Sequence, residues 1–270
     1  MKKRIMILTL LIITLVAAFT YMFIEPYLVQ VTPYREVNKD IPEAFNGTKI
    51  VFVSDIHHSK DLSLNRVNAL VKRINDMKPD MILLGGDYAN RIAYSEKCIE
   101  ALDELKAPMG VYGVLGNHDH WAGVVKVKEF FSKTNIKLLD NSSLWLEKGD
   151  ARIKLGGAGD FWTDKQDINK TIHDVNEKDY AILLCHNPDF VEQIRTNKVD
   201  LVLSGHNHGG QVTFFGLWAK TSSKYGMKYR TGIVETEYTK VLVSNGIGTV
   251  FYPMRFWAWP EINVITLSNR

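Results

Sequence analysis

Cysteine is scarce in this chain. Only two of its 270 residues are Cys, Cys98 and Cys185, and both lie in apolar surroundings without CxxC spacing. A disulfide framework and a zinc knuckle are therefore not expected, and we predict two buried free thiols. A chain of this length can bury a core without such crosslinks.

An excess of charge of one sign is also absent. The formal net charge is +3 at pH 7, and the basic residues are scattered along the sequence. Nucleic-acid-binding domains usually gather Lys and Arg on one face or stripe. The composition therefore indicates an ordinary globular protein and argues against nucleic acid as its principal partner.

Charge is missing altogether from residues 5–24, which form the one long apolar run. At about 1.5 Å per residue, a helix of this length spans about 30 Å, the thickness of the hydrocarbon core of a bilayer. We predict an uncleaved transmembrane anchor; a cleaved signal peptide, which usually has a shorter apolar region and a small-x-small site, is the alternative. Basic residues precede the run, so the positive-inside rule predicts that residues 1–4 are cytoplasmic and that the rest of the chain lies outside the cytoplasm. We therefore expect a single-pass protein of the cell membrane.

Residues 25–47 mix prolines, charges and isolated apolar residues, which predicts a tether and an approach strand. The folded domain is expected at residues 48–270. In its first half, apolar runs typical of buried strands alternate with segments of helical periodicity. We expect strands within residues 49–55, 80–87 and 110–119, and helices within residues 62–77, 94–106 and 125–135. This βαβαβ order predicts a parallel sheet whose carboxyl ends share one edge.

Shorter segments follow in the second half. Residues 142–149 and 151–160 alternate as an antiparallel hairpin does. Further strands are expected within residues 179–188, 199–208, 239–248 and 261–268. The order favours an α/β fold of two packed mixed sheets with outer helices over a barrel.

Polar side chains that can bind metals follow five of the expected strands. They are Asp55, His57, Asp87, Asn117, His118, His186, His206 and His208. Each signal alone is weak, because a single His at a strand end is usually structural. However, five of the eight histidines lie in these loops, and we therefore predict one shared site.

These residue types favour a metal centre. Carboxylate, imidazole and amide groups without a thiolate suit Mn, Zn or Fe in an open site. Two ions that share a carboxylate use about seven protein ligands and leave positions for water and substrate. We expect two divalent metal ions, with manganese favoured, and Asp87 as the bridging residue.

The series DIHH, GGD, GNHD, CHNP and GHNH resembles the calcineurin-like metallophosphoesterase superfamily, whose pattern is DxH, GD, GNH(D/E), H and GHxH. The resemblance extends from about Thr48 to the C-terminus. The runs GHNHGGQ and YPMRFWAWPEI are similar to its membrane-anchored bacterial branch, with the YkuE and YaeI types and the UDP-2,3-diacylglucosamine pyrophosphatases. The resemblance implies a four-layer α/β/β/α sandwich of two mixed sheets after the transmembrane helix.

The resemblance also implies roles for individual residues. One metal would bind Asp55, His57, Asp87 and His208, and the other would bind Asp87, Asn117, His186 and His206. A metal-bridging hydroxide would be the nucleophile. We expect His118 to stabilise or protonate the leaving oxygen, and Asp119 to orient its ring.

The function expected from these features is hydrolysis of a phosphate ester or pyrophosphate by a membrane-anchored enzyme. The anchor alone suggests a lipid or cell-envelope substrate, and the topology opposes a nucleotide-lipid substrate in the cytoplasm. A catalytically silent metal-binding scaffold of the same fold is the alternative, although no ligand position is lost. Another two-metal hydrolase, such as a peptidase or lactamase, is disfavoured because the chain lacks an HxHxDH-like cluster.

Some features have two interpretations. His58 would contact substrate or lie in a solvated loop, and Asn207 is expected to point away from the ligands. Gly209 and Gly210 are expected to let the backbone turn tightly beside the ions. The aromatic segments 214–218 and 251–259 would line an acyl-chain groove or meet the membrane surface, or else pack between sheet and loops.

Overall fold

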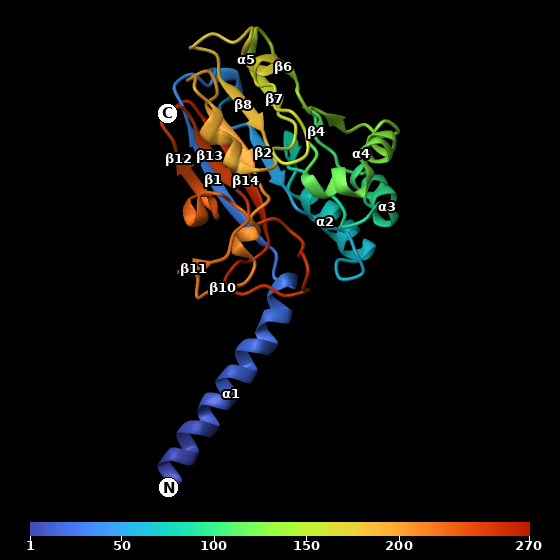
Figure 1. Cartoon of the computed structure of the whole chain (residues 1–270). Coiled ribbons are helices and arrows are strands. Elements are labelled where there is room, and N and C mark those ends of the chain that lie inside the picture. Colours follow the sequence, from blue (N-terminus) through green and yellow to red (C-terminus); the bar gives the residue numbers. More distant parts are fainter.

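The N-terminal helix stands apart from the rest of the molecule. The computed structural model describes every residue from Met1 to Arg270. Helix α1 (Lys2–Ile24) has no buried residue and extends away from the globular part (Figure 1). It is long and apolar enough to cross a membrane, with a mean hydropathy of 2.5 in its most apolar window. A short 3-10 helix, η1 (Glu25–Tyr27), connects it to the domain.

The first sheet holds the predicted parallel strands. Its order is β1-β14-β2-β3-β4-β5. The strands are β1 (Gln30–Val37), β2 (Lys49–Val53), β3 (Met81–Leu84), β4 (Val111–Gly113), β5 (Lys137–Leu138) and β14 (Glu261–Ser268). The connecting helices are α2 (Leu64–Asp76), α3 (Ile92–Leu102) and α4 (Asn117–Phe131). All three predicted helices and the βαβαβ order are therefore confirmed.

The approach strand expected within residues 25–47 is β1, and it belongs to the first sheet. It pairs in parallel with β14 from Gln30↔Glu261 to Val37↔Ser268. Strand β14 in turn pairs antiparallel with β2. Because β14 comes from the C-terminal end of the chain, this segment is integrated into the fold through a long-range pairing that local sequence does not signal.

The second sheet has the order β12-β13-β9-β8-β7-β6. Its strands are β6 (Ser142–Lys148), β7 (Ala151–Gly157), β8 (Ala181–Leu184), β9 (Leu201–Ser204), β12 (Gly232–Glu235) and β13 (Lys240–Val243). Strands β6 and β7 form the predicted antiparallel hairpin. A separate small hairpin joins β10 (Thr213–Phe214) to β11 (Trp218–Ala219).

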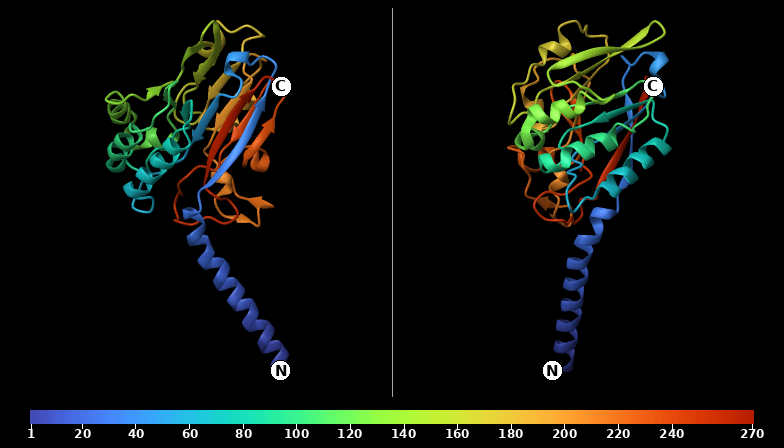
Figure 2. Two further views of the ribbon diagram at one scale, coloured as in Figure 1. Left: turned by 180° about the vertical axis from the view of Figure 1, so that it is seen from behind. Right: turned by 90° about the vertical axis from the view of Figure 1, so that its right-hand side faces the viewer.

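The two sheets pack face to face. Phe52 and Leu83 of the first sheet share one buried cluster with Leu155 and Leu203 of the second. On the outer face of the first sheet, α2, α3 and α4 bury a second cluster. The outer face of the second sheet is covered by short helices, mainly α5 (Asn169–Ile172) and η3 (Pro188–Gln193). The predicted layered sandwich is confirmed, with a thin fourth layer (Figure 2).

The packing brings the carboxyl ends of strands from both sheets to one edge. Strands β2, β3 and β4 run parallel in the first sheet, and β8 and β9 run parallel in the second. The loops that follow these strands carry most of the predicted ligands, and Asn117 and His118, expected at a strand end, lie in the first turn of α4. The edge therefore collects polar residues from five separate parts of the chain.

Candidate metal centre

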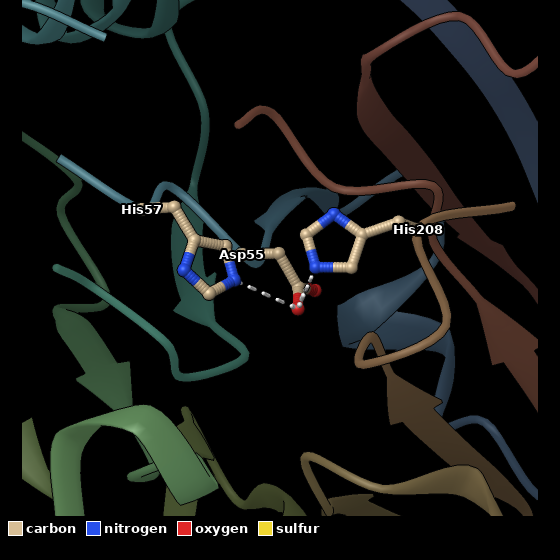
Figure 3. A group of neighbouring side chains, drawn as sticks. All are labelled: Asp55, His57 and His208. Atoms are coloured by element: carbon tan, nitrogen blue, oxygen red, sulfur yellow. Dashed lines mark ion pairs between the residues drawn. The ribbon is translucent and has the colours of Figure 1, made fainter. Parts of the chain in front are cut away.

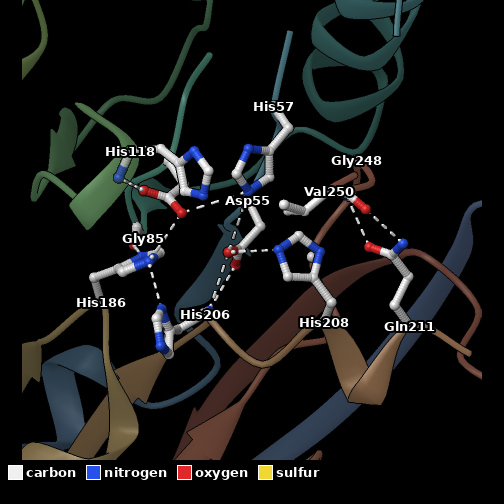
Figure 4. Close-up of polar contacts among 12 residues, drawn as sticks. Asp55, His57, Gly85, His118, His186, His206, His208, Gln211, Gly248 and Val250 are labelled. Carbon is white, nitrogen blue, oxygen red and sulfur yellow. Dashed lines mark hydrogen bonds and ion pairs between the residues drawn. The ribbon is translucent and has the colours of Figure 1, made fainter. Parts of the chain in front are cut away.

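The carboxylates and imidazoles of the five loops converge at this edge. The Nε2 atom of His186 lies 3.2 Å from Oδ2 of Asp87, and Nε2 of His57 lies 3.4 Å from the same oxygen. The Nδ1 atom of His206 lies 3.3 Å from Nε2 of His186. Figure 4 shows His57, His118, His186, His206 and His208 surrounding Asp55. The structure thus brings together ligands from both sheets.

Asp55, His57 and His208 form one half of the centre. The Nε2 atom of His208 lies 3.4 Å from Oδ1 of Asp55, and Nε2 of His57 lies 3.9 Å from it. Figure 3 shows the Asp55 carboxylate between the two rings. The ligand atoms of this trio lie within 4.8 Å of one another, as do those of Asp55, Asp87 and His186. Such spacing suits ions that share ligands.

Backbone strain is concentrated at these residues. Positive φ angles occur at five predicted ligands, which are Asp55 (53°), His57 (50°), Asp87 (56°), His206 (70°) and His208 (50°). Non-glycine residues seldom adopt this left-handed conformation, which costs about 1–3 kcal/mol at each position and is found mostly at functional sites. The concentration of strained residues at the predicted ligands indicates a functional site.

Neighbouring polar groups fix the ring orientations. The Nδ1 atom of His57 lies 2.6 Å from Oδ1 of Asn90, and Nδ1 of His186 lies 2.7 Å from the carbonyl oxygen of Gly85. Both partners are acceptors, so each Nδ1 carries the proton and donates it. In the neutral form of each ring, Nε2 then offers its lone pair towards the centre of the site.

Two predicted ligand atoms are buried without a hydrogen-bond partner. They are Nε2 of His57 and Oδ1 of Asn117. Buried polar atoms are nearly always paired, because an unpaired one costs about 1–3 kcal/mol. Divalent cations would satisfy both lone pairs, and the oxygen and nitrogen donors suit such ions. The residues present therefore fit the implied metals.

The protonation states favour cation binding. Burial lowers the pKa of His57 to about 4 and that of His206 to about 3, and it lowers the pKa of His208 well below its ordinary value. Neutral imidazoles are the form that binds metal. Burial also raises the pKa of Asp55 to about 6, because the cost of desolvating its carboxylate outweighs the attraction of His186.

Asp87 and His186 form a buried pair of opposite charge. Burial alone would raise the pKa of Asp87, but His186 and His57 outweigh this effect and hold the pKa below its ordinary value. Asp87 in turn raises the pKa of His186 well above normal. The proton on His186 therefore stands where a metal ion would bind, and metal binding would release it.

His118 lines the cavity beside the centre. Its ring centroid lies 4.7 Å from that of His57, and its ligand atom lies within 4.8 Å of those of His57 and Asp87. Its backbone N–H donates to Oδ1 of Asp87 at 2.8 Å. The ring is therefore close to the metal ligands and also reaches the cavity.

The hydrogen bonds of Asp119 differ from those expected of a residue that orients the His118 ring. Its carboxylate accepts hydrogen bonds from the backbone N–H groups of Asp87 (2.8 Å), Tyr88 (3.0 Å) and Gly116 (2.9 Å). It makes no hydrogen bond to the His118 ring, because it is buried and turned towards the backbone. Asp119 thus holds the loops after β3 and β4 together and positions Asp87.

Arg255 has no role in the predictions made from sequence, and the structure places it behind His208. Its fully buried guanidinium donates to the carbonyl oxygens of Gly248 (2.6 Å), Ala258 (2.7 Å), Asn245 (2.8 Å) and His208 (3.3 Å). The motif YPMRFWAWPEI contains this residue, but an Arg in an aromatic segment is not a signal of burial. Asn90 was also missed, although it comes three residues after Asp87.

The last ligand loop is tightly constrained by glycines. Gly209 and Gly210 both have positive φ angles, 61° and 82°, which confirms the predicted tight turn. A Cβ atom at Gly205 would overlap Oδ2 of Asp55, so only glycine lets this loop approach the carboxylate. Asn207 points away as predicted, and its Nδ2 donates to the carbonyl oxygen of Tyr229 at 2.9 Å.

His58 matches neither of its two interpretations. Its side chain is buried, and its Nδ1 lies 2.8 Å from the carbonyl oxygen of Leu62. The ring packs edge-on against Tyr94. His58 therefore has a structural role in the loop after β2.

A cavity of about 580 Å³ opens next to the centre. The cavity is lined by four predicted site residues and by two indole rings. The four residues are Asp87, Asn117, His118 and His206. The rings are those of Trp121 and Trp162, whose centroids lie 6.3 Å apart, and the Trp162 centroid is 4.3 Å from that of His206. The cavity is large enough for a phosphorylated small group, and aromatic walls can contact its apolar part.

The sequence is similar to those of known proteins. A family profile described as calcineurin-like phosphoesterase matches residues 48–210. The chain is 31% identical over 252 residues to the "Uncharacterized metallophosphoesterase YkuE" of Bacillus subtilis (strain 168), with coverage of 92% of this chain and 88% of that protein. It is 29% identical to a "Transmembrane protein with metallophosphoesterase domain" of Danio rerio, with coverage of 85% and 55%. A 5'-nucleotidase precursor structure from Thermus thermophilus superposes with a TM-score of 0.47 at 14% identity, covering 81% of this chain and 54% of that one.

Proposed function

The chain belongs to the calcineurin-like phosphoesterase family and is a metal-dependent phosphoric ester hydrolase; from this premise we propose that two divalent metal ions act together in its site. The observation that carries the proposal is the convergence of carboxylates and imidazoles from both sheets. The unpaired Nε2 of His57 and Oδ1 of Asn117 support it. The substrate is a phosphate ester or pyrophosphate.

The ligands divide into two sets that share Asp87. One set is Asp55, His57, Asp87 and His208, and the other is Asp87, Asn117, His186 and His206. Bound there, the two ions would supply Lewis acidity towards the phosphoryl oxygens and lower the pKa of a water molecule for in-line attack. Manganese is the favoured ion, because oxygen and imidazole donors without thiolate suit it.

The chain's own groups orient the reaction. The N–H groups of His57 and His186 are held by Asn90 and Gly85, so both rings keep a fixed direction during turnover. His118, which is half-buried at the cavity, is proposed to stabilise or protonate the leaving oxygen. Asp119 is a positioning residue, because its carboxylate holds the backbone on both sides of Asp87.

The chain is proposed to be anchored in the cell membrane through α1. The exposed apolar surface of that helix supports this location, as does the name of the Danio rerio relative. The basic residues that precede the apolar run favour a catalytic domain outside the cytoplasm. The anchor also favours substrates linked to lipids or to the cell envelope.

The experiment is an assay of the full chain in detergent. Bound metal is measured first, and hydrolysis of p-nitrophenyl phosphate and bis(p-nitrophenyl) phosphate is then compared with Mn, Zn and Fe. Turnover with two metals per chain is expected; undetectable hydrolysis with every ion would contradict the proposal and favour a silent scaffold. A reporter fused to the C-terminus tests the topology, which a cytoplasmic signal would overturn.

A further inference from the structure

Large apolar side chains are exposed in two segments at one end of the domain. We call them the aromatic collar: Phe214, Phe215, Leu217 and Trp218 around the β10–β11 hairpin, and Phe251, Tyr252, Trp257 and Trp259 before β14. Leu217 is 78% exposed and Phe251 is 94% exposed. Apolar groups this exposed are rarely clustered on a soluble surface unless something covers them.

The collar is fixed to the end of α1. The backbone N–H of Arg255 donates to the carbonyl oxygen of Met22 at 2.9 Å. Glu25 is fully buried, and its carboxylate accepts from the N–H groups of Trp257 (2.9 Å) and Ala258 (2.7 Å). These bonds hold the second collar segment directly against the helix end. Figure 1 shows both collar segments at the end of the domain from which α1 leaves.

The hairpin segment is fixed to the other segment in turn. The Gln211 side chain donates to the carbonyl oxygen of Val250 at 2.9 Å and accepts from its N–H at 2.8 Å. The N–H of Thr213 donates to the carbonyl oxygen of Phe256 at 3.0 Å. The ring centroids of Phe215 and Phe256 are 5.4 Å apart. The two collar segments are therefore bonded to each other and to the end of α1.

Basic residues are concentrated in one segment beside the collar, where Lys228 pairs with Glu192 of η3. Residues 211–230 contain four basic side chains and no acidic one. They are Lys220, Lys224, Lys228 and Arg230. Tyr and Trp prefer the interface between water and hydrocarbon, and nearby Lys and Arg are attracted to anionic lipid headgroups.

We propose that the aromatic collar inserts into the leaflet from which α1 emerges and holds the metal site at the membrane surface. The proposal rests on the membrane anchor of the proposed function. Val212, Phe251 and Tyr252 line the cavity that also holds Asp87 and His206. The opening of the cavity thus borders the inserted surface. The substrate class that follows is a phosphate ester of a membrane amphiphile, whose headgroup enters the cavity from the bilayer.

Tryptophan quenching tests the insertion, because α1 contains no Trp and three of the chain's six Trp residues lie in the collar. The full chain is reconstituted into phosphatidylglycerol vesicles with or without brominated acyl chains. Wild type should be quenched, and Trp218→Phe should lose about a third of the quenched emission, since one of three collar indoles is removed. Trp145→Phe, in β6, should lose only unquenched emission. Equal emission with and without bromine would overturn the proposal.

Matched substrates test the consequence for catalysis. Hexadecyl and methyl p-nitrophenyl phosphate have the same scissile bond, but only the first partitions into vesicles. The double variant Leu217→Ser with Trp218→Ser should slow hydrolysis of the hexadecyl ester about fivefold or more and leave the methyl ester unchanged. Val125→Ser is the matched control, because Val125 is 82% exposed on α4, away from the collar. Equal slowing of both esters would contradict the proposal.

The two experiments also separate this proposal from the proposed function. Bromine quenching without hydrolysis of either diester or of p-nitrophenyl phosphate would support insertion of the collar and overturn the phosphoesterase activity. Hydrolysis of the methyl ester without quenching would support the activity and overturn insertion.

Discussion

His186 and Asp87 lie side by side although they belong to different sheets. The Nε2 atom of His186 is 3.2 Å from Oδ2 of Asp87, yet His186 follows β8 of the second sheet and Asp87 follows β3 of the first. The site therefore exists only where the two sheets are packed together. Loss of the metals should consequently weaken the contact between the sheets as well as abolish chemistry.

Asp87→Asn should remove most of the activity. The substitution keeps the shape of the side chain but removes the negative charge that both proposed ions share, so we expect kcat to fall roughly a thousandfold. Metal content, measured by mass spectrometry, should fall below two ions per chain. Asp76→Asn is the control, because Asp76 pairs only with Lys72 on the surface of α2. Full activity with both metals retained would refute the bridging role.

His118→Asn should lower turnover without removing metal. Loss of a general acid typically costs about 100- to 10,000-fold in rate. The loss should be smaller with p-nitrophenol as leaving group than with an alkyl alcohol, because the better leaving group needs less protonation. The measurements are kcat with a p-nitrophenyl ester and with an alkyl ester, together with the metal content of the variant. His173→Asn, at an exposed residue, is the control. Equal losses with both leaving groups would argue against proton donation.

Arg255→Lys should destabilise the domain. A lysine offers three donors and cannot reach all the carbonyl oxygens that the guanidinium bonds. Buried acceptors would then be left unpaired, which costs about 3 kcal/mol in unfolding free energy. Denaturant unfolding in detergent measures this loss. Because Arg255 also bonds the backbone of His208, metal affinity should fall in parallel. An Arg255→Lys variant with unchanged unfolding free energy would contradict the stabilising role, and weaker metal binding in that variant would limit the role of Arg255 to the metal site.

Asp200→Asn should change how stability depends on pH. Burial raises the pKa of Asp200 to about 6 from an ordinary value near 3.8. The folded state therefore favours the protonated form, and the contribution of this group to stability falls as pH rises from about 4 to about 6. Wild type should lose up to about 1.4 kcal/mol more per pH unit than the variant in this window. Unfolding at several pH values tests the difference, and parallel curves would contradict it.

The segments near the site could be predicted from sequence because their signals are local. Continuous apolar runs and their terminal polar residues predicted β2, β3, β8 and β9. The role of Asp119 could not be derived in this way. Its carboxylate binds three backbone N–H groups contributed by two loops, and only the folded chain brings those donors together.

Other features depend on pairings across the whole chain. The sequence predicts an approach strand within residues 25–47, but the place of β1 in the first sheet is defined by its partner β14, more than 200 residues away. The burial of Arg255 likewise depends on four carbonyl groups whose positions are set by separate loops. The residues that neighbour a position in the sequence do not indicate which distant residues will contact it in the fold.

The sequence by itself determined the order of the strands and helices that carry the site, the apolar N-terminal helix and the types of residue that can bind metal. These depend on hydrophobic periodicity and side-chain chemistry, which are properties of neighbouring residues. Only the tertiary structure decided that Asp87 meets His186, that Asp119 holds backbone rather than a ring, and that the aromatic segments gather beside α1. Such contacts form between parts of the chain that are distant in sequence, and their geometry is set by how the two sheets pack.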